Sequence, residues 1–154
     1  MILAEVLKRF PKKKEYLIEI LLEYQKQKET HHFEEHELKE IANYLNIPES
    51  RVCSVVGFYT FFSTEPRGKY IFQICRDLPC QLNDNFDLLS SIQMILGIKV
   101  GETTQDGLFT LEYTSCLGHC DKSPAIRVND KIHGSLSLNK LKAIVAECKE
   151  KENA

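Results

Sequence analysis

The sequence predicts an α+β protein in which an N-terminal helical bundle is followed by a small mixed sheet covered by helices. Apolar residues recur at spacings of three and four between residues 3 and 59, a pattern typical of amphipathic helices. A turn at residues 63–68, which contains both proline and glycine, ends that pattern. Short stretches rich in β-branched and aromatic residues follow it. We therefore expect two domains, residues 1–66 and residues 67–154.

The helical domain is expected to contain a succession of helices with recognisable end signals. The first begins near residue 3 and ends before Pro11, and the second covers residues 12–29. A third ends at Asn46, a residue that readily adopts the backbone conformation of a helix stop. Pro48 can open a fourth, because its missing N–H would be unpaired there in any case.

The second domain is expected to alternate strands with helices. Its expected strands are residues 70–74, 109–113, 125–128 and 130–134, and the last two form a hairpin around Asn129-Asp130. Its expected helices are residues 86–96, stopped by Gly97, and residues 138–149, capped by Ser137.

Composition and missing motifs argue against several classes of function. The formal net charge is −2 and opposite charges are interspersed, so we expect no nucleic-acid partner. Neither glycine-rich phosphate-binding pattern occurs, so the chain alone is not expected to bind a nucleotide. The N-terminus does not resemble a secretory signal, and the longest apolar run, residues 52–62, is too short to span a bilayer. We expect a soluble, cytoplasmic protein without membrane insertion.

Two pairs of cysteines follow two of the predicted strands. Cys75 and Cys80 follow the first strand, and Cys116 and Cys120 follow the second. Closely paired cysteines in a cytosolic protein are typical of metal or redox sites. Four thiolates can hold either a structural zinc ion or a 2Fe-2S cluster, and the spacing admits both. Thiol–disulfide exchange is a minor alternative, because that chemistry prefers two residues between the cysteines.

The neighbours of the second pair favour iron and sulfur. Gly118 lets the backbone approach an inorganic sulfide, and Pro124 closes the loop without adding a donor. His119 offers a Cys3His site as an alternative, but we expect it to lie beside the ligands because Cys120 already supplies a donor. A second group of histidines is expected to be a solvated loop rather than a metal patch, and it comprises His31, His32 and His36.

The remaining cysteines and a cluster of aromatic residues are expected to serve packing. Cys53 and Cys148 fall on or beside helical apolar stripes, where free cysteine behaves as a small apolar residue. The aromatic cluster is expected at the seam between the helices and the sheet, with a docking role for any member left exposed. It comprises Phe58, Tyr59, Phe61 and Phe62.

Longer segments around these residues resemble a known family. This is the small thioredoxin-like 2Fe-2S subunit of the NADH-oxidising module of complex I, together with the equivalent subunit of NAD(P)-linked iron hydrogenases and formate dehydrogenases. Ser123 departs from the family pattern, in which alanine usually precedes the proline. The matching segments occur in the family's order and are Val56-Gly-Phe-Tyr59 with Phe61-Phe62, Cys75-x4-Cys80, residues 101–112, Cys116-Leu-Gly-His-Cys120 and residues 124–130.

The resemblance implies a thioredoxin-like domain that holds one 2Fe-2S cluster through Cys75, Cys80, Cys116 and Cys120. It also implies docking on a larger flavin- and NAD(P)-binding iron–sulfur subunit of a multisubunit oxidoreductase, and exchange of single electrons with that subunit's FMN. The chain would then be a non-catalytic electron-transfer subunit, located in the cytoplasm or on the cytoplasmic side of a membrane complex. A zinc-stabilised interaction module without redox activity is the alternative.

Overall fold

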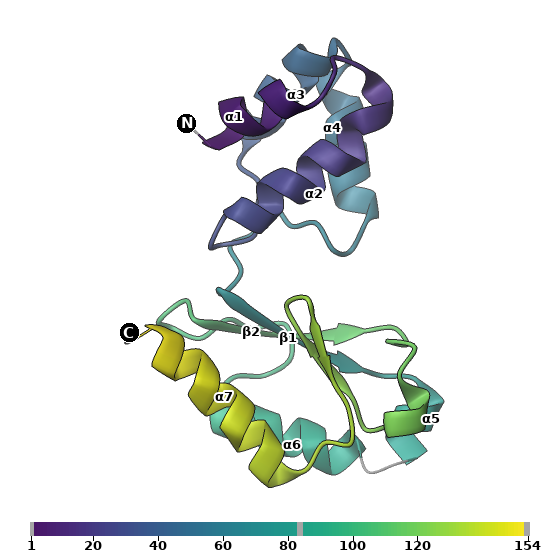
Figure 1. Ribbon diagram of the computed structural model, residues 1–154, viewed down its shortest axis with the longest axis vertical. Helices are drawn as coiled ribbons and strands as arrows, with labels where there is room; N and C mark the ends of the chain where they lie inside the picture. Colours follow the sequence, from purple (N-terminus) through teal and green to yellow (C-terminus); the bar gives the residue numbers. More distant parts are fainter. Residues whose placement is uncertain (1, 83–84, 153–154) are drawn as a thin grey trace. The chain divides into compact units, whose positions relative to one another are not determined.

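The computed structural model describes residues 2–82 and 85–152, and the chain divides into two compact units, Met1–Arg67 and Gly68–Ala154 (Figure 1). The first unit is helical and the second contains the sheet. Among the described residues, no helix combines the length and the apolar character that a membrane span requires.

The helical unit contains the succession of helices expected from its apolar periodicity. Asn46 ends one of them in the left-handed conformation, with φ of 52°, and Pro48 immediately precedes the next. The elements are α1 (Ile2–Arg9), η1 (Lys14–Tyr16), α2 (Leu17–Gln27), α3 (Glu35–Leu45) and α4 (Glu49–Phe58).

Aromatic residues help to fill the core of this unit. Phe33 and Phe62 are both buried, and their rings meet edge to face with centroids 5.6 Å apart. Burying an apolar side chain of this size stabilises a fold by about 1.5–3 kcal/mol. The prediction that the aromatic cluster packs is wrong for two members: Phe58, at the end of α4, is 77% exposed, and Phe61 is 37% exposed.

A buried carboxylate links α2, the loop after it and α3. Both oxygens of Glu37 lie 2.8 Å from Nζ of Lys28, and the Glu34 N–H donates to Oε2 at 2.8 Å. The Tyr24 hydroxyl donates to Oε1. Burial alone would raise the pKa of Glu37, but these bonds hold it below its usual value. Glu37 also occupies the third position of α3 and completes its capping box.

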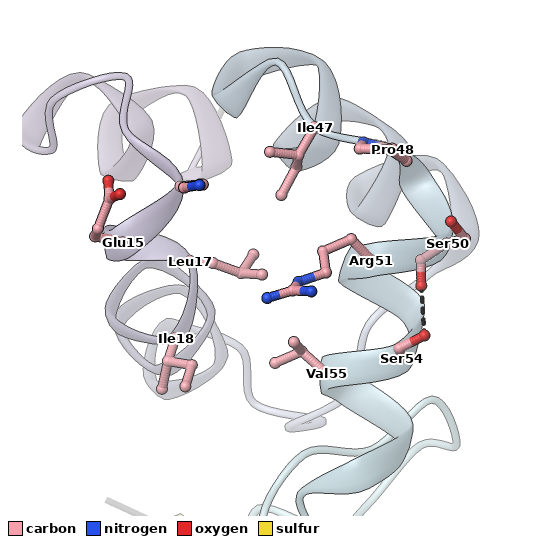
Figure 2. A pocket seen from close by; sticks show the side chains of 10 residues that line it. Glu15, Leu17, Ile18, Ile47, Pro48, Ser50, Arg51, Ser54 and Val55 are labelled. Atoms are coloured by element: carbon pink, nitrogen blue, oxygen red, sulfur yellow. Dashed lines mark hydrogen bonds between the residues drawn. The ribbon is translucent and has the colours of Figure 1, made fainter.

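A hollow of about 700 Å³ lies within the helical unit, between the start of α2 and α4 (Figure 2). Its apolar wall includes Leu17, Ile47 and Val55, and the guanidinium of Arg51 extends across it. No cysteine lines this hollow.

Gly57 is a place where the helical unit can be stabilised. It lies in α4, and a Cβ added there would meet nothing within 4 Å. Because glycine costs a helix conformational entropy, Gly57→Ala is expected to raise the free energy of unfolding by about 0.5–1 kcal/mol. Denaturant unfolding followed by circular dichroism measures this, and a lowered midpoint would contradict it.

The sheet unit contains a mixed four-stranded sheet in the order β2-β1-β3-β4. Strand β1 pairs parallel with β2 and antiparallel with β3, and β3 and β4 form the expected hairpin. The α+β fold class is therefore confirmed. The elements are β1 (Tyr70–Cys75), α5 (Leu78–Leu82), α6 (Asn85–Leu96), β2 (Phe109–Thr114), η2 (Cys120–Lys122), β3 (Ile126–Val128), β4 (Lys131–His133) and α7 (Leu138–Glu152).

Helices α6 and α7 cover one face of this sheet (Figure 1). Alternate residues of β1 point to that face, and Phe72 and Ile74 pack in one cluster with Ile92 of α6 and Leu141 of α7. Gln73 points the other way, accepts a hydrogen bond from Arg127 of β3 and donates one to Glu112 of β2. The covered face thus supplies the hydrophobic core of the sheet unit.

Candidate metal centre

The parallel pairing of β1 and β2 brings the two cysteine pairs to the same edge of the sheet. Cys75, the last residue of β1, lies opposite Thr114, the last residue of β2. Cys116 follows two residues later. Because parallel strands leave a sheet at the same edge, residues distant in sequence meet there.

The first pair is buried. Cys75 and Cys80 are 1% and 2% exposed, and their thiols are hydrogen-bonded to each other. The chain returns to Cys80 through α5, where the Cys80 N–H donates to the Asp77 carbonyl at 3.0 Å. Burial raises the pKa of the Cys80 thiol to about 11, and the Ala125 N–H, which donates to this sulfur, acts in the opposite direction.

The second pair is exposed. The sulfurs of Cys116 and Cys120 are 3.3 Å apart, and the Gly118 N–H donates to the Cys116 sulfur at 3.4 Å. Gly118 has φ of 71°, a conformation that glycine adopts without strain. The hydrogen bond with Cys116 raises the pKa of Cys120, and repulsion from Cys75 adds to the effect. Cys120 is thus electrostatically linked to the first pair.

This arrangement fits the donor set of a 2Fe-2S cluster. Such a cluster takes four thiolates, two for each iron, and the thiols here form two contacting pairs at one sheet edge. Backbone N–H groups already donate to a sulfur of each pair. In residues 2–82 and 85–152, no three histidine, cysteine or acidic side chains are grouped as a site for a single metal ion.

The other predicted site residues lie close to the second pair in the chain. His119 and Pro124 are half-buried, and His119 lies next to Gly134, a residue that no sequence pattern singled out. The three N-terminal histidines belong to the helical unit: His31 and His32 lie in the loop before α3, whereas His36 lies in α3 itself and not in the predicted loop. Among them, His32 contacts the Thr30 hydroxyl and His36 contacts a carboxylate oxygen of Glu34.

One expectation about the unpaired cysteines is wrong, and one helix beside the first pair was not expected. Cys53 is exposed, because α4 turns Val52 and Val56 to the core and Cys53 lies about 100° around the helix from Val52. Cys148 is buried on α7, as predicted. Helix α5 was not predicted at all, although Pro79 near its start is a residue that favours the first turn of a helix.

Comparison with known proteins agrees with this geometry. Residues 3–149 match the model of the family described as thioredoxin-like 2Fe-2S ferredoxin. A subunit of the NADH-quinone oxidoreductase of Rhizobium meliloti (strain 1021) is 40% identical over 119 residues, which cover 77% of this chain and 71% of the relative. A subunit of the NADH-quinone oxidoreductase of Aquifex aeolicus (strain VF5) is 35% identical over 142 residues, which cover 90% of this chain and 88% of the relative.

A solved structure shares the fold. The NAD+-reducing NiFe hydrogenase in its air-oxidized state superimposes with a TM-score of 0.77 at 18% identity, covering 88% of this chain and 23% of the hydrogenase chain. This chain thus corresponds to about a quarter of that longer polypeptide. From the family match and the two relatives, the chain belongs to the thioredoxin-like 2Fe-2S ferredoxin family.

Proposed function

We propose that this chain is an electron-transfer subunit that holds one 2Fe-2S cluster and exchanges single electrons with the FMN of a larger partner subunit. The observation that carries the proposal is the meeting of two thiol pairs at one sheet edge in a member of a 2Fe-2S family. When bound, a 2Fe-2S cluster accepts and releases one electron at a time. The proposed ligands are Cys75, Cys80, Cys116 and Cys120.

The protein's own groups would prepare and tune this site. Cysteine binds metal as the thiolate, so the thiols lose their protons when they become ligands. The N–H groups of Gly118 and Ala125 then donate to sulfurs that carry negative charge, which stabilises that charge. His119 and Pro124 would flank the second pair of ligands.

The proposed partner is a larger iron–sulfur subunit that binds FMN and NAD(P), within a multisubunit oxidoreductase of the complex I, hydrogenase or formate dehydrogenase type. The two relatives are subunits of NADH-quinone oxidoreductases, which supports this proposal. We place the assembly in the cytoplasm or on the cytoplasmic side of a membrane. Residues 1–66 and 67–154 would act in it as separate domains, and this chain would carry no catalytic residue.

Thiol–disulfide exchange is less well supported by the site. A thiol that attacks disulfides usually has a lowered pKa, because the thiolate is the nucleophile. Here the hydrogen bond with Cys116 raises the pKa of Cys120, the exposed partner of the second pair.

The first test is the composition of the chain purified without oxygen. We expect two irons and two acid-labile sulfides for each chain, with visible absorption that is bleached by reduction. A colourless protein that contains one zinc ion and no sulfide would contradict this proposal and would indicate the alternative, a zinc-stabilised interaction module without redox activity.

The second test concerns the flavin partner. In the complex purified with its other subunits, NADH or NADPH is expected to produce the paramagnetic signal of the reduced cluster. The same nucleotides added to the isolated chain are expected to produce none, because this chain lacks the nucleotide-binding glycine patterns. A signal in the isolated chain would contradict the need for a partner.

A further inference from the structure

The loop between β4 and α7 holds the segment that follows Cys120. The Ser135 N–H donates to the Lys122 carbonyl at 2.5 Å, and the Leu136 N–H donates to the Pro124 carbonyl at 3.2 Å. Leu136 is itself buried in the core of the sheet unit. The loop therefore ties the chain after Cys120, the last of the four proposed ligands, to the core.

Gly134 lets this loop approach closely. A Cβ added to Gly134 would lie 2.8 Å from both the Cβ and the carbonyl oxygen of Lys122, and 2.6 Å from Cδ2 of His119. Neither atom of Lys122 belongs to the flexible end of its side chain, so the turn itself would have to move. Gly134 does not have a positive φ, and its requirement is therefore one of space.

The other end of the held segment reaches the first pair of thiols. Ala125 follows Pro124, is 1% exposed, and donates its N–H to the sulfur of Cys80. The contact with the β4–α7 loop thus lies between one proposed ligand, Cys120, and the amide that donates to another. A displacement at Lys122 would be transmitted in both directions along this short stretch.

We propose that Gly134 is a positioning residue for the metal centre: it allows the β4–α7 loop to hold residues 120–125 so that the Ala125 N–H is directed at the Cys80 sulfur. This inference rests on the proposed function. Reduction adds negative charge to the cluster and its thiolate ligands, and an N–H donor stabilises that charge. Close packing at Gly134 therefore raises the reduction potential of the site.

The test compares Gly134→Ala with the wild-type chain and with Gly57→Ala, which adds the same methyl group where nothing lies within 4 Å. Iron and sulfide are assayed first, and the reduction potential is then measured by titration followed with electron paramagnetic resonance. We expect Gly134→Ala to shift the potential downward and to alter the resonance signal. At the potential where half of the wild type is reduced, the ratio of reduced to oxidised Gly134→Ala should be lower than that of the wild type by about threefold or more. For a one-electron couple, a tenfold change in this ratio corresponds to about 59 mV. Gly57→Ala should match the wild type.

A second variant covers the case in which Gly134→Ala does not fold. Lys140 is exposed on α7, and its ammonium donates a hydrogen bond of 2.6 Å to the Gly134 carbonyl. Lys140→Met therefore loosens the loop without adding atoms beside Lys122. Lys142→Met removes the same charge from the same helix and is the matched control. We expect a downward shift in Lys140→Met that exceeds any shift in Lys142→Met.

The two proposals fail in different ways. If the wild-type chain contains no iron or sulfide, the proposed function fails and the positioning role fails with it. If the wild type holds its cluster and the folded variants at Gly134 and Lys140 share its potential and its signal, only the positioning role is overturned.

Discussion

Cys116→Ser is expected to lose the cluster or to bind it at least about tenfold more weakly, because a hydroxyl replaces one of the four proposed thiolate ligands. The Cys116 sulfur also contacts the Cys120 sulfur and accepts the Gly118 N–H, so the change disturbs the whole exposed pair. Visible absorption together with iron and sulfide content measures the loss. An unchanged spectrum would remove Cys116 from the ligand set.

The chain supplies two matched controls for this experiment. Cys53→Ser changes another exposed thiol, and Cys148→Ser changes a buried one, and neither residue belongs to the two pairs. Both variants are expected to keep the spectrum and the iron content of the wild type. Burial raises the pKa of Cys148, so this thiol stays protonated and acts as a small apolar group in the core. Loss of the cluster in either control would mean that serine acts through stability rather than through ligation.

Glu37→Ala is expected to lower the free energy of unfolding of the helical unit by about 3–5 kcal/mol. The change would leave the ammonium of Lys28 without its carboxylate, although the side chain of Lys28 is only 14% exposed. The Tyr24 hydroxyl and the Glu34 N–H would lose their acceptor at the same time. Urea unfolding followed by circular dichroism measures the effect.

Glu35→Ala is the appropriate control for Glu37→Ala. Glu35 lies in the same turn of α3, and its carboxylate pairs with Lys39 at an exposed position. Exposed ion pairs contribute little to the free energy of unfolding. We expect Glu35→Ala to change the free energy of unfolding far less than Glu37→Ala does. Equal losses of unfolding free energy in the two variants would show that the buried network around Glu37 stabilises the helical unit no more than an exposed ion pair does.

The effect of Glu37 should also depend on pH in a defined direction. Its pKa is lowered in the folded chain, so its contribution is complete above the ordinary pKa of glutamate and is lost as the pH falls through the lowered value. The difference in unfolding free energy between wild type and Glu37→Ala should therefore narrow in acid. A difference that is constant between neutral pH and about pH 3 would contradict this.

The sequence predicted those features that depend on local patterns. The helix ends at Asn46 and Pro48 and the hairpin around Asn129 follow from the conformational preferences of single residues or short turns. The exposure of Cys53 could not be predicted from such patterns. Helix α4 contains Val52, Val55 and Val56 as well as Cys53, and the pattern alone does not tell which of these apolar residues face the core.

Long-range contacts explain what the sequence did not reveal about the site. Glu37 reads as an ordinary polar residue in the first turn of a helix, and its burial depends on Lys28 and Tyr24 arriving from another helix and loop. Gly134 likewise has no local signal, because its conformation is ordinary and the crowding comes from Lys122. Contacts of this kind depend on which strands and loops lie side by side.

The unequal exposure of the two thiol pairs gives the proposed metal centre an inner and an outer side. Cys75 and Cys80 are placed by the end of a central strand and by α5, whereas Cys116 and Cys120 remain open to solvent. The inner half of the site is therefore completed by folding itself. Iron donors, chelators and oxidants would all arrive from the outer side, so loading and damage share one route.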